Sequence, residues 1–133
     1  MSEYTIVERQ DAFDYMAEYP GYGEMRSYTD ALDAEQVALT WRTMPAGTGG
    51  RGSYGHLHKS QEEIYFVVSG EVTFKVNDDV FKADAGTAVR LAAQAVRSIH
   101  NDGPGEAQLV LCSVRIDDPV ADALTQDDFW PEG

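Results

Sequence analysis

Residues 50–70, GRGSYGHLHKSQEEIYFVVSG, carry the strongest signal in this sequence of 133 residues. Two histidines, His56 and His58, are separated by one residue, and a β-branched and aromatic run follows over 63–68. Side chains two apart on a strand leave it on the same face, about 7 Å apart at the backbone. A short polar turn precedes Glu63, whose carboxylate can return to that face. The stretch therefore predicts neighbouring strands that bring two imidazoles and a carboxylate together.

The rest of the chain from residue 37 shows the same alternation of short strand patterns and turns. Gly, Asn and Asp clusters interrupt the apolar runs at regular intervals, and no helical pattern lies between them. This arrangement is typical of an antiparallel sandwich or barrel. We expect an all-β fold, an antiparallel β-barrel or jelly roll of six to eight strands. A single domain over 1–133 is predicted, with an N-terminal arm (1–36), a barrel (37–116) and an acidic C-terminal tail (117–133).

Two short helical turns are expected outside the barrel. Asp11 is a suitable cap for a turn over 12–18, which Pro20 would end, although Tyr15 and Tyr19 fit an extended arm equally well. A second turn is expected near 120–124, in the tail.

The strand pattern over 63–68 is apolar on both faces. Tyr65 shares the parity of Glu63 and is expected to line the barrel, whereas Ile64, Phe66 and Val68 face the other way. The outer face of this strand therefore needs a cover, either the N-terminal arm or a second subunit. We expect a homodimer.

The charge balance excludes several classes of partner. Ten Lys and Arg oppose 23 Asp and Glu, for a net charge of −13, and both nucleic acids and anionic membranes require a positive field. The sequence has neither an apolar stretch of about 18 residues nor a secretory signal, and its single cysteine, Cys112, cannot form an intrachain disulfide. We expect a cytoplasmic protein with an inert, buried Cys112. The dispersed carboxylates fit either a soluble, self-repelling surface or a high-salt habitat.

Two imidazoles and one carboxylate on a common face suit a divalent cation. Each neutral ring offers a nitrogen lone pair, and such a trio leaves positions open for water, oxygen or substrate. We therefore expect His56, His58 and Glu63 to bind a divalent metal ion, either Fe, Mn, Ni or Zn. A His-x-His pattern by itself equally fits two structural histidines.

The spacing resembles a family pattern. Gly50, five residues, His56-Leu57-His58, four residues, Glu63, six residues and Gly70 match the first signature of the cupin superfamily, G-x5-H-x-H-x3–4-E-x6-G. The run HLHKSQEEIYFVVSGE is similar to that of small single-domain cupins. Membership would imply a closed β-barrel with a pocket into which these side chains converge.

The second cupin signature, G-x5-P-x-G-x2-H-x3-N, is largely lost. Counted from Gly86, only that glycine and Asn101 remain, and Arg97 stands where metal-binding cupins have a further histidine ligand. Arginine has no acceptor atom and cannot be a metal ligand. His100 does not replace it, because a separation of three residues on a strand places it on the opposite face.

Two interpretations of Arg97 remain open. In the first, Arg97 lies beside a metal held by three ligands and binds an anionic substrate, with Tyr65 and Tyr54 as further substrate-binding candidates. In the second, Arg97 pairs directly with Glu63 and displaces the cation. The first interpretation implies a metal-dependent dioxygenase or isomerase acting on a small anionic substrate. The second implies a non-catalytic, metal-free cupin that binds a small molecule.

Overall fold

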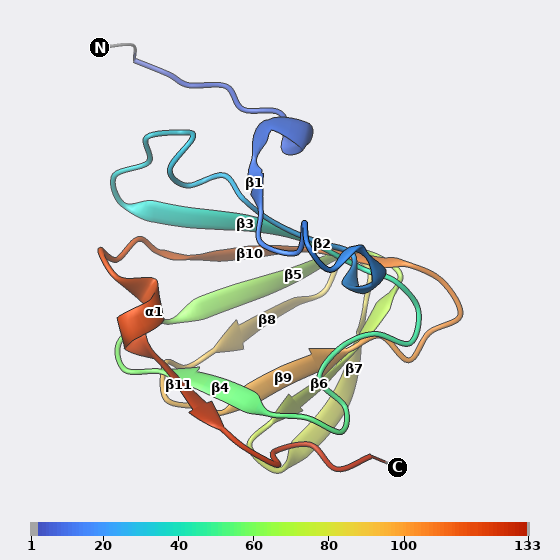
Figure 1. Ribbon diagram of the computed structural model, residues 1–133. Helices are drawn as coiled ribbons and strands as arrows, with labels where there is room; N and C mark the ends of the chain where they lie inside the picture. The colour runs from blue at the N-terminus through green and yellow to red at the C-terminus, as the bar shows by residue number, and fades with distance from the viewer. Residues whose placement is uncertain (1–2, 133) are drawn as a thin grey trace.

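Two antiparallel sheets make up the computed structural model, which describes residues 3–132 (Figure 1). Strands follow the order β1-β2-β3-β10-β5-β8 in the six-stranded sheet and β11-β4-β9-β6-β7 in the five-stranded sheet. The elements are β1 (Phe13–Asp14), β2 (Glu24–Ser27), β3 (Val37–Met44), β4 (Gly55–His58), β5 (Glu63–Ser69), β6 (Glu71–Val76), β7 (Asp79–Asp84), β8 (Ala88–Leu91), β9 (Arg97–His100), β10 (Ala107–Val114), the helix α1 (Pro119–Asp122), β11 (Ala123–Gln126), and two 3-10 turns, η1 (Arg9–Asp11) and η2 (Pro20–Tyr22).

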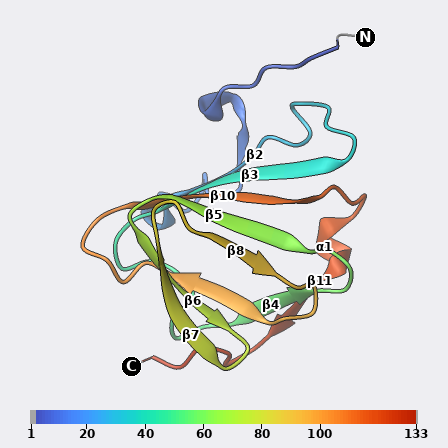
Figure 2. The ribbon, with the colours of Figure 1, turned by 180° about the vertical axis from the view of Figure 1, so that it is seen from behind.

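The predicted all-β jelly roll is confirmed. Eight strands, β3 to β10, lie within residues 37–116, and the view from behind shows the two sheets enclosing the space between them (Figure 2). The total exceeds the six to eight strands expected because β1 and β2 come from the predicted arm and β11 from the predicted tail.

The core forms between the inner faces of the two sheets. Along β5 the inward Tyr65 and Val67 are buried, whereas Ile64, Phe66 and Val68 are 44%, 41% and 38% exposed. Both sheets contribute to the core cluster, which contains Met44, Tyr65, Val67, Val72, Phe74, Ala83, Leu91, Ala107 and Leu109. Alternation along the strands thus separates a packed interior from an outer face that the single chain leaves exposed.

Close contacts explain why the first motif has glycine at positions 50 and 70. Gly70 joins β5 to β6 with φ of +76°, and a Cβ there would lie 2.7 Å from the carbonyl oxygen of Glu106. A Cβ on Gly50 would lie 1.8 Å from Ser98 Oγ, since the loop before β4 passes directly over β9. Neither position accepts a side chain without displacement of its neighbours.

The expected helical turn over 12–18 is wrong. The chain instead forms η1 over Arg9–Asp11 and then the short strand β1, which pairs with β2. Asp14 Oδ1 accepts hydrogen bonds at 2.9 Å from the amide of Met25, which holds β1 against β2, and from the amide of Met16, at the start of the turn over 15–18. A contact with a distant strand thus overrides the local capping signal.

The C-terminal tail is part of the five-stranded sheet. The helix expected near 120–124 is α1, which begins at Pro119 and ends at Asp122, and β11 then pairs antiparallel with β4. Downstream, Phe129 and Trp130 are buried. In the part of the chain that the structure describes, no helix has the length and apolar character needed to cross a bilayer.

Candidate metal centre

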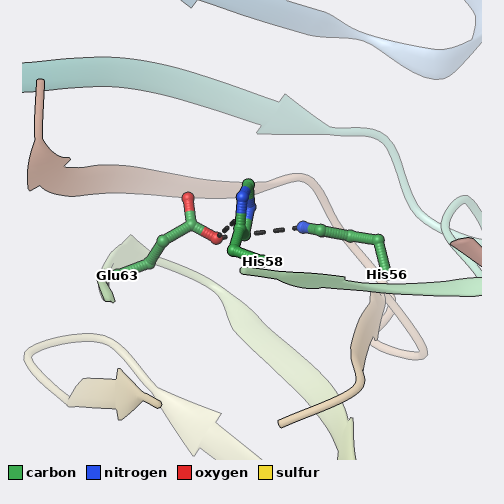
Figure 3. A group of neighbouring side chains, drawn as sticks. All are labelled: His56, His58 and Glu63. Carbon is green, nitrogen blue, oxygen red and sulfur yellow. Dashed lines mark ion pairs between the residues drawn. The ribbon is translucent and has the colours of Figure 1, made fainter. Parts of the chain in front are cut away.

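The two histidines and the glutamate converge from opposite sheets. His56 and His58 leave β4 on one face, and Glu63 is the first residue of β5 in the other sheet (Figure 3). Glu63 Oε1 lies 3.3 Å from His58 Nε2 and 3.8 Å from His56 Nε2. One ligand atom from each residue lies within 4.8 Å of the others. The sequence expectation that these three side chains share one point is therefore met.

The group fits a divalent cation in geometry. Ligand atoms bound to one ion at about 2.1 Å lie about 3–4 Å apart. The two distances from Glu63 Oε1 fall in this range, and an ordinary adjustment of side chains would suffice to close on an ion. Two nitrogen ligands and one oxygen ligand also match the borderline metals expected from the sequence.

The protonation states favour the same conclusion. Burial lowers the pKa of His58, so that its ring is neutral and its lone pair is available at neutral pH. Burial alone would raise the pKa of Glu63, but the neighbouring His56 and the positive charge of Arg97 hold that pKa below its ordinary value. Glu63 is therefore an anion under the same conditions.

Arg97 lies directly beside this group. It is the first residue of β9, opposite His56 in the β4–β9 pairing, and it has no exposed surface. Its Nη2 donates to Glu63 Oε1 at 3.1 Å, and its Nη1 donates to the carbonyls of Ala93 at 3.0 Å and Ala95 at 2.7 Å. The direct pair with Glu63 foreseen in the second interpretation is thus present.

The third histidine stays outside the group. His100 Nδ1 accepts a hydrogen bond from the amide of Arg51 at 3.3 Å, and its ring lies 6.1 Å from that of Trp130. This placement agrees with the parity argument for β9.

The two tyrosines occupy different environments. Tyr65 follows Glu63 on the same face of β5, is almost fully buried, and has its pKa raised mainly by that burial. Tyr54, immediately before β4, is 57% exposed. The substrate-binding roles expected for Tyr65, Tyr54 and Arg97 stay predictions.

Asp122 is a polar partner of the site that sequence reasoning missed. Its Oδ2 lies 3.2 Å from His58 Nδ1, on the side of the ring opposite Glu63. The signal was hidden because Asp122 is one carboxylate among many in the acidic tail, 64 residues from His58. Only the pairing of β11 with β4 brings it near.

Asn101, one of the two residues that remain of the second motif, serves the fold. Asn101 is fully buried, and its Nδ2 donates to the carbonyls of Met44 at 2.9 Å and Gly105 at 2.8 Å. Its Oδ1 accepts from the amide of Gly103. Asn101 therefore organises the loop that follows β9.

Known structures with the same fold are numerous. A cupin protein from Bacteroides fragilis is 20% identical with a TM-score of 0.69, over 89% of this chain and 89% of that one. The polyketide cyclase RemF from Streptomyces resistomycificus is 15% identical with a TM-score of 0.70, over 94% and 85%. A predicted oxalate decarboxylase from Thermotoga maritima is 19% identical with a TM-score of 0.64, over 84% and 100%. At these identities the likeness concerns the fold alone.

A search of curated proteins gives no sequence match. The family comparison gives a direct result, because the model for the cupin domain matches residues 41–114, more than half of the chain. This range contains His56, His58, Glu63 and Arg97. The chain belongs to the cupin family.

Proposed function

We propose that the protein binds a divalent metal ion, Fe, Mn, Ni or Zn, through His56, His58 and Glu63. We further propose that this centre serves a dioxygenase or isomerase reaction on a small anionic substrate. The observation that carries the proposal is that one ring nitrogen from each histidine and a carboxylate oxygen of Glu63 lie within 4.8 Å of one another. Solved cupins of similar fold include a predicted oxalate decarboxylase and a putative sugar phosphate isomerase, which supports a small-molecule reaction.

Each side chain has a separate task in this proposal. When bound, the ion would supply Lewis acidity or oxygen activation. His58 and Glu63 are the inner ligands, with side chains 8% and 13% exposed, whereas the His56 side chain is 35% exposed and marks the approach from solvent. Arg97 fixes the orientation of Glu63, and its buried positive charge favours an anion nearby. Tyr54, at the exposed start of β4, would contact the substrate near the entrance.

A second function is supported by the Arg97–Glu63 pair. A guanidinium 3.1 Å from the carboxylate competes for the negative charge that a cation would need. In this alternative the protein is a metal-free cupin that binds a small molecule without reaction. The two functions differ in one measurable property, the metal content.

A ligand screen tests the proposed substrate class. Small carboxylic acids should raise the melting temperature of metal-reconstituted protein, because an anion would take a ligand position left open by three protein ligands. The increase should be absent in the His56→Ala/His58→Ala variant and kept in a His100→Ala control, which leaves the centre intact. An equal increase in metal-free and metal-loaded protein would support the binding-module alternative.

We also propose that the protein is a homodimer through the outer face of the six-stranded sheet. Pairing in register places Val110 beside both Phe66 and Trp41, and Cys112 beside Ile64. Residues directly opposite share a face, so apolar side chains form continuous rows. The outer face consists of Val37, Leu39, Trp41, Ile64, Phe66, Val68, Val110, Cys112 and Val114.

The charge distribution favours a second copy as the partner on this face. The outward positions of the three described central strands β3, β5 and β10 carry no charged side chain, although the chain has a net charge of −13. Charged residues border this apolar strip on the flanking strands, with Arg26 on β2 beside Trp41 and Arg90 on β8 beside Ile64. Electrostatic repulsion between two acidic copies is smallest when they meet through this uncharged face. The N-terminal arm contributes Arg9, whose guanidinium lies 5.1 Å from the Trp41 ring, but Ile64 and Phe66 remain exposed in the single chain.

Cys112 is half-buried on this face, and the expectation of a buried thiol is wrong because its strand neighbours face outward.

The dimer has a direct test in the charge variant Phe66→Asp. Wild-type protein should have the mass of two 14.7 kDa chains by light scattering, and Phe66→Asp should have the mass of one, since it places two carboxylates in an apolar contact. Val80→Asp, an equivalent change at an exposed position on β7, is the control and should remain dimeric. The Cys112 thiol should also react more slowly with a thiol reagent in the wild-type dimer than in the monomeric Phe66→Asp variant. A monomeric wild-type protein would contradict the proposal.

A further inference from the structure

The polar environment of His58 includes a residue from the far end of the chain. Asp122, the last residue of α1, places its Oδ2 3.2 Å from His58 Nδ1. Its Oδ1 accepts from Ser60 Oγ at 2.7 Å and from the Ser60 amide at 3.1 Å, and its Oδ2 accepts from the Gln61 amide at 3.1 Å. The carboxylate thus binds both the imidazole and the turn that connects β4 to β5.

The donors around Asp122 assign the proton on His58. The Ser60 hydroxyl and the amides of Ser60 and Gln61 all donate to the two carboxylate oxygens of Asp122, which is the arrangement that an acceptor-only carboxylate requires. An anionic carboxylate only accepts hydrogen bonds. His58 Nδ1 must therefore donate, and in a neutral ring Nε2 then carries the lone pair that faces Glu63 and His56.

Without Asp122 the proton would have a different position. The remaining carboxylate near the ring is Glu63, whose Oε1 lies 3.3 Å from His58 Nε2. A neutral His58 freed from Asp122 would place its proton on Nε2 and donate to Glu63, which would block the ligand atom. The two carboxylates compete for one proton, and the contact on the Nδ1 side determines the outcome.

We infer that Asp122 is a positioning residue, which keeps the proton of His58 on Nδ1 and orients its Nε2 toward the proposed metal ion. The part of this inference that concerns the ion rests on the proposed function, whereas the assignment of the His58 proton to Nδ1 does not depend on it. The C-terminal segment holds Asp122 in place from both sides. Asp118 caps α1 through the amide of Ala121, and β11 pairs with β4 immediately after the helix.

The experiment compares Asp122→Ala with Asp117→Ala. Both variants remove one carboxylate from the same C-terminal segment, but Asp117 is fully exposed and pairs with Arg115 rather than with His58, so that the change in net charge is matched. Loss of a partner to a ligating histidine should weaken binding of Mn or Zn salts about 10–100-fold in Asp122→Ala. Asp117→Ala should retain the wild-type affinity. Equal affinities in the two variants would overturn the inference.

The tautomer provides a readout that needs neither metal nor variant. At about pH 8, where an ordinary histidine is neutral, the imidazole nitrogen chemical shifts of metal-free wild-type protein should report a proton on Nδ1 of His58. In Asp122→Ala the proton should move to Nε2. A wild-type ring protonated on Nε2 would overturn the inference. Wild-type protein that binds no metal but shows the Nδ1 proton would refute the proposed function and leave the role of Asp122 established.

Discussion

The double substitution His56→Ala/His58→Ala is expected to abolish divalent-metal binding. It removes both nitrogen ligands of the candidate centre and leaves a single carboxylate already paired with Arg97. Purified wild-type protein, prepared without chelators, should contain up to one equivalent of metal by elemental analysis. The double variant should contain none, with affinity in calorimetry reduced by more than about 100-fold.

His100→Ala is the matched control for this experiment. It removes the third histidine of the chain, which bonds to the Arg51 amide outside the centre, and should leave metal content unchanged. Wild-type protein that stays metal-free after reconstitution, with no thermal shift on addition of Mn, Ni or Zn salts, would refute the metal-centre proposal. The metal-free binding function would then be the better description.

Replacing Arg97 is expected to produce the largest loss of stability. Arg97→Ala leaves Glu63 as a nearly buried anion without its cation. It also removes the hydrogen bond from Arg97 Nη1 to the carbonyl of Ala95. Truncation of one partner of a buried ion pair costs about 3–5 kcal/mol. Denaturant unfolding of Arg97→Ala should therefore show a decrease in the free energy of unfolding of that order.

Arg90→Ala is the control for the loss of charge. Arg90 pairs with Glu62 on the surface, where both side chains are more than half exposed. Exposed pairs contribute about 0–1 kcal/mol, so this variant should unfold almost as wild type does. Similar decreases in the free energy of unfolding in the two variants would show that the buried Arg97–Glu63 pair contributes no more to stability than the exposed Arg90–Glu62 pair.

The substitution Arg97→His distinguishes the metal-bound interpretation of the site from the metal-free one. The change removes a fixed positive charge beside Glu63 and introduces a neutral ring with an acceptor nitrogen. Metal affinity should rise relative to wild type, as measured by calorimetry. A fall in affinity would mean that the guanidinium supports the ligand set more than it opposes the ion.

The sequence was sufficient for the fold and for the convergence of His56, His58 and Glu63. Periodicity and turn residues from 37 to 116 predicted the strands, and the spacing of His56, His58 and Glu63 predicted their common face because strand geometry is regular. The parity argument also placed His100 away from the centre. These features depend on local spacing, which a single sequence records directly.

The parts that could not be predicted depend on contacts between distant segments. Asp122 reaches His58 only through the β11–β4 pairing, and Asp14 is held against β2 by the amide of Met25, so that strand β1 forms where a helical turn was expected. Neither contact leaves a periodic trace in the sequence. The number of strands was underestimated for the same reason, since short segments at both ends complete sheets that the central pattern already defines.

The pairing of β11 with β4 also makes the candidate centre sensitive to local opening of one edge of the five-stranded sheet. β11 is the outermost strand of that sheet, and it borders His56 and His58 directly. Asp122 precedes β11 and lies 64 residues from His58 in the sequence. Detachment of β11 alone would therefore separate Asp122 from His58 while the other strands stay paired.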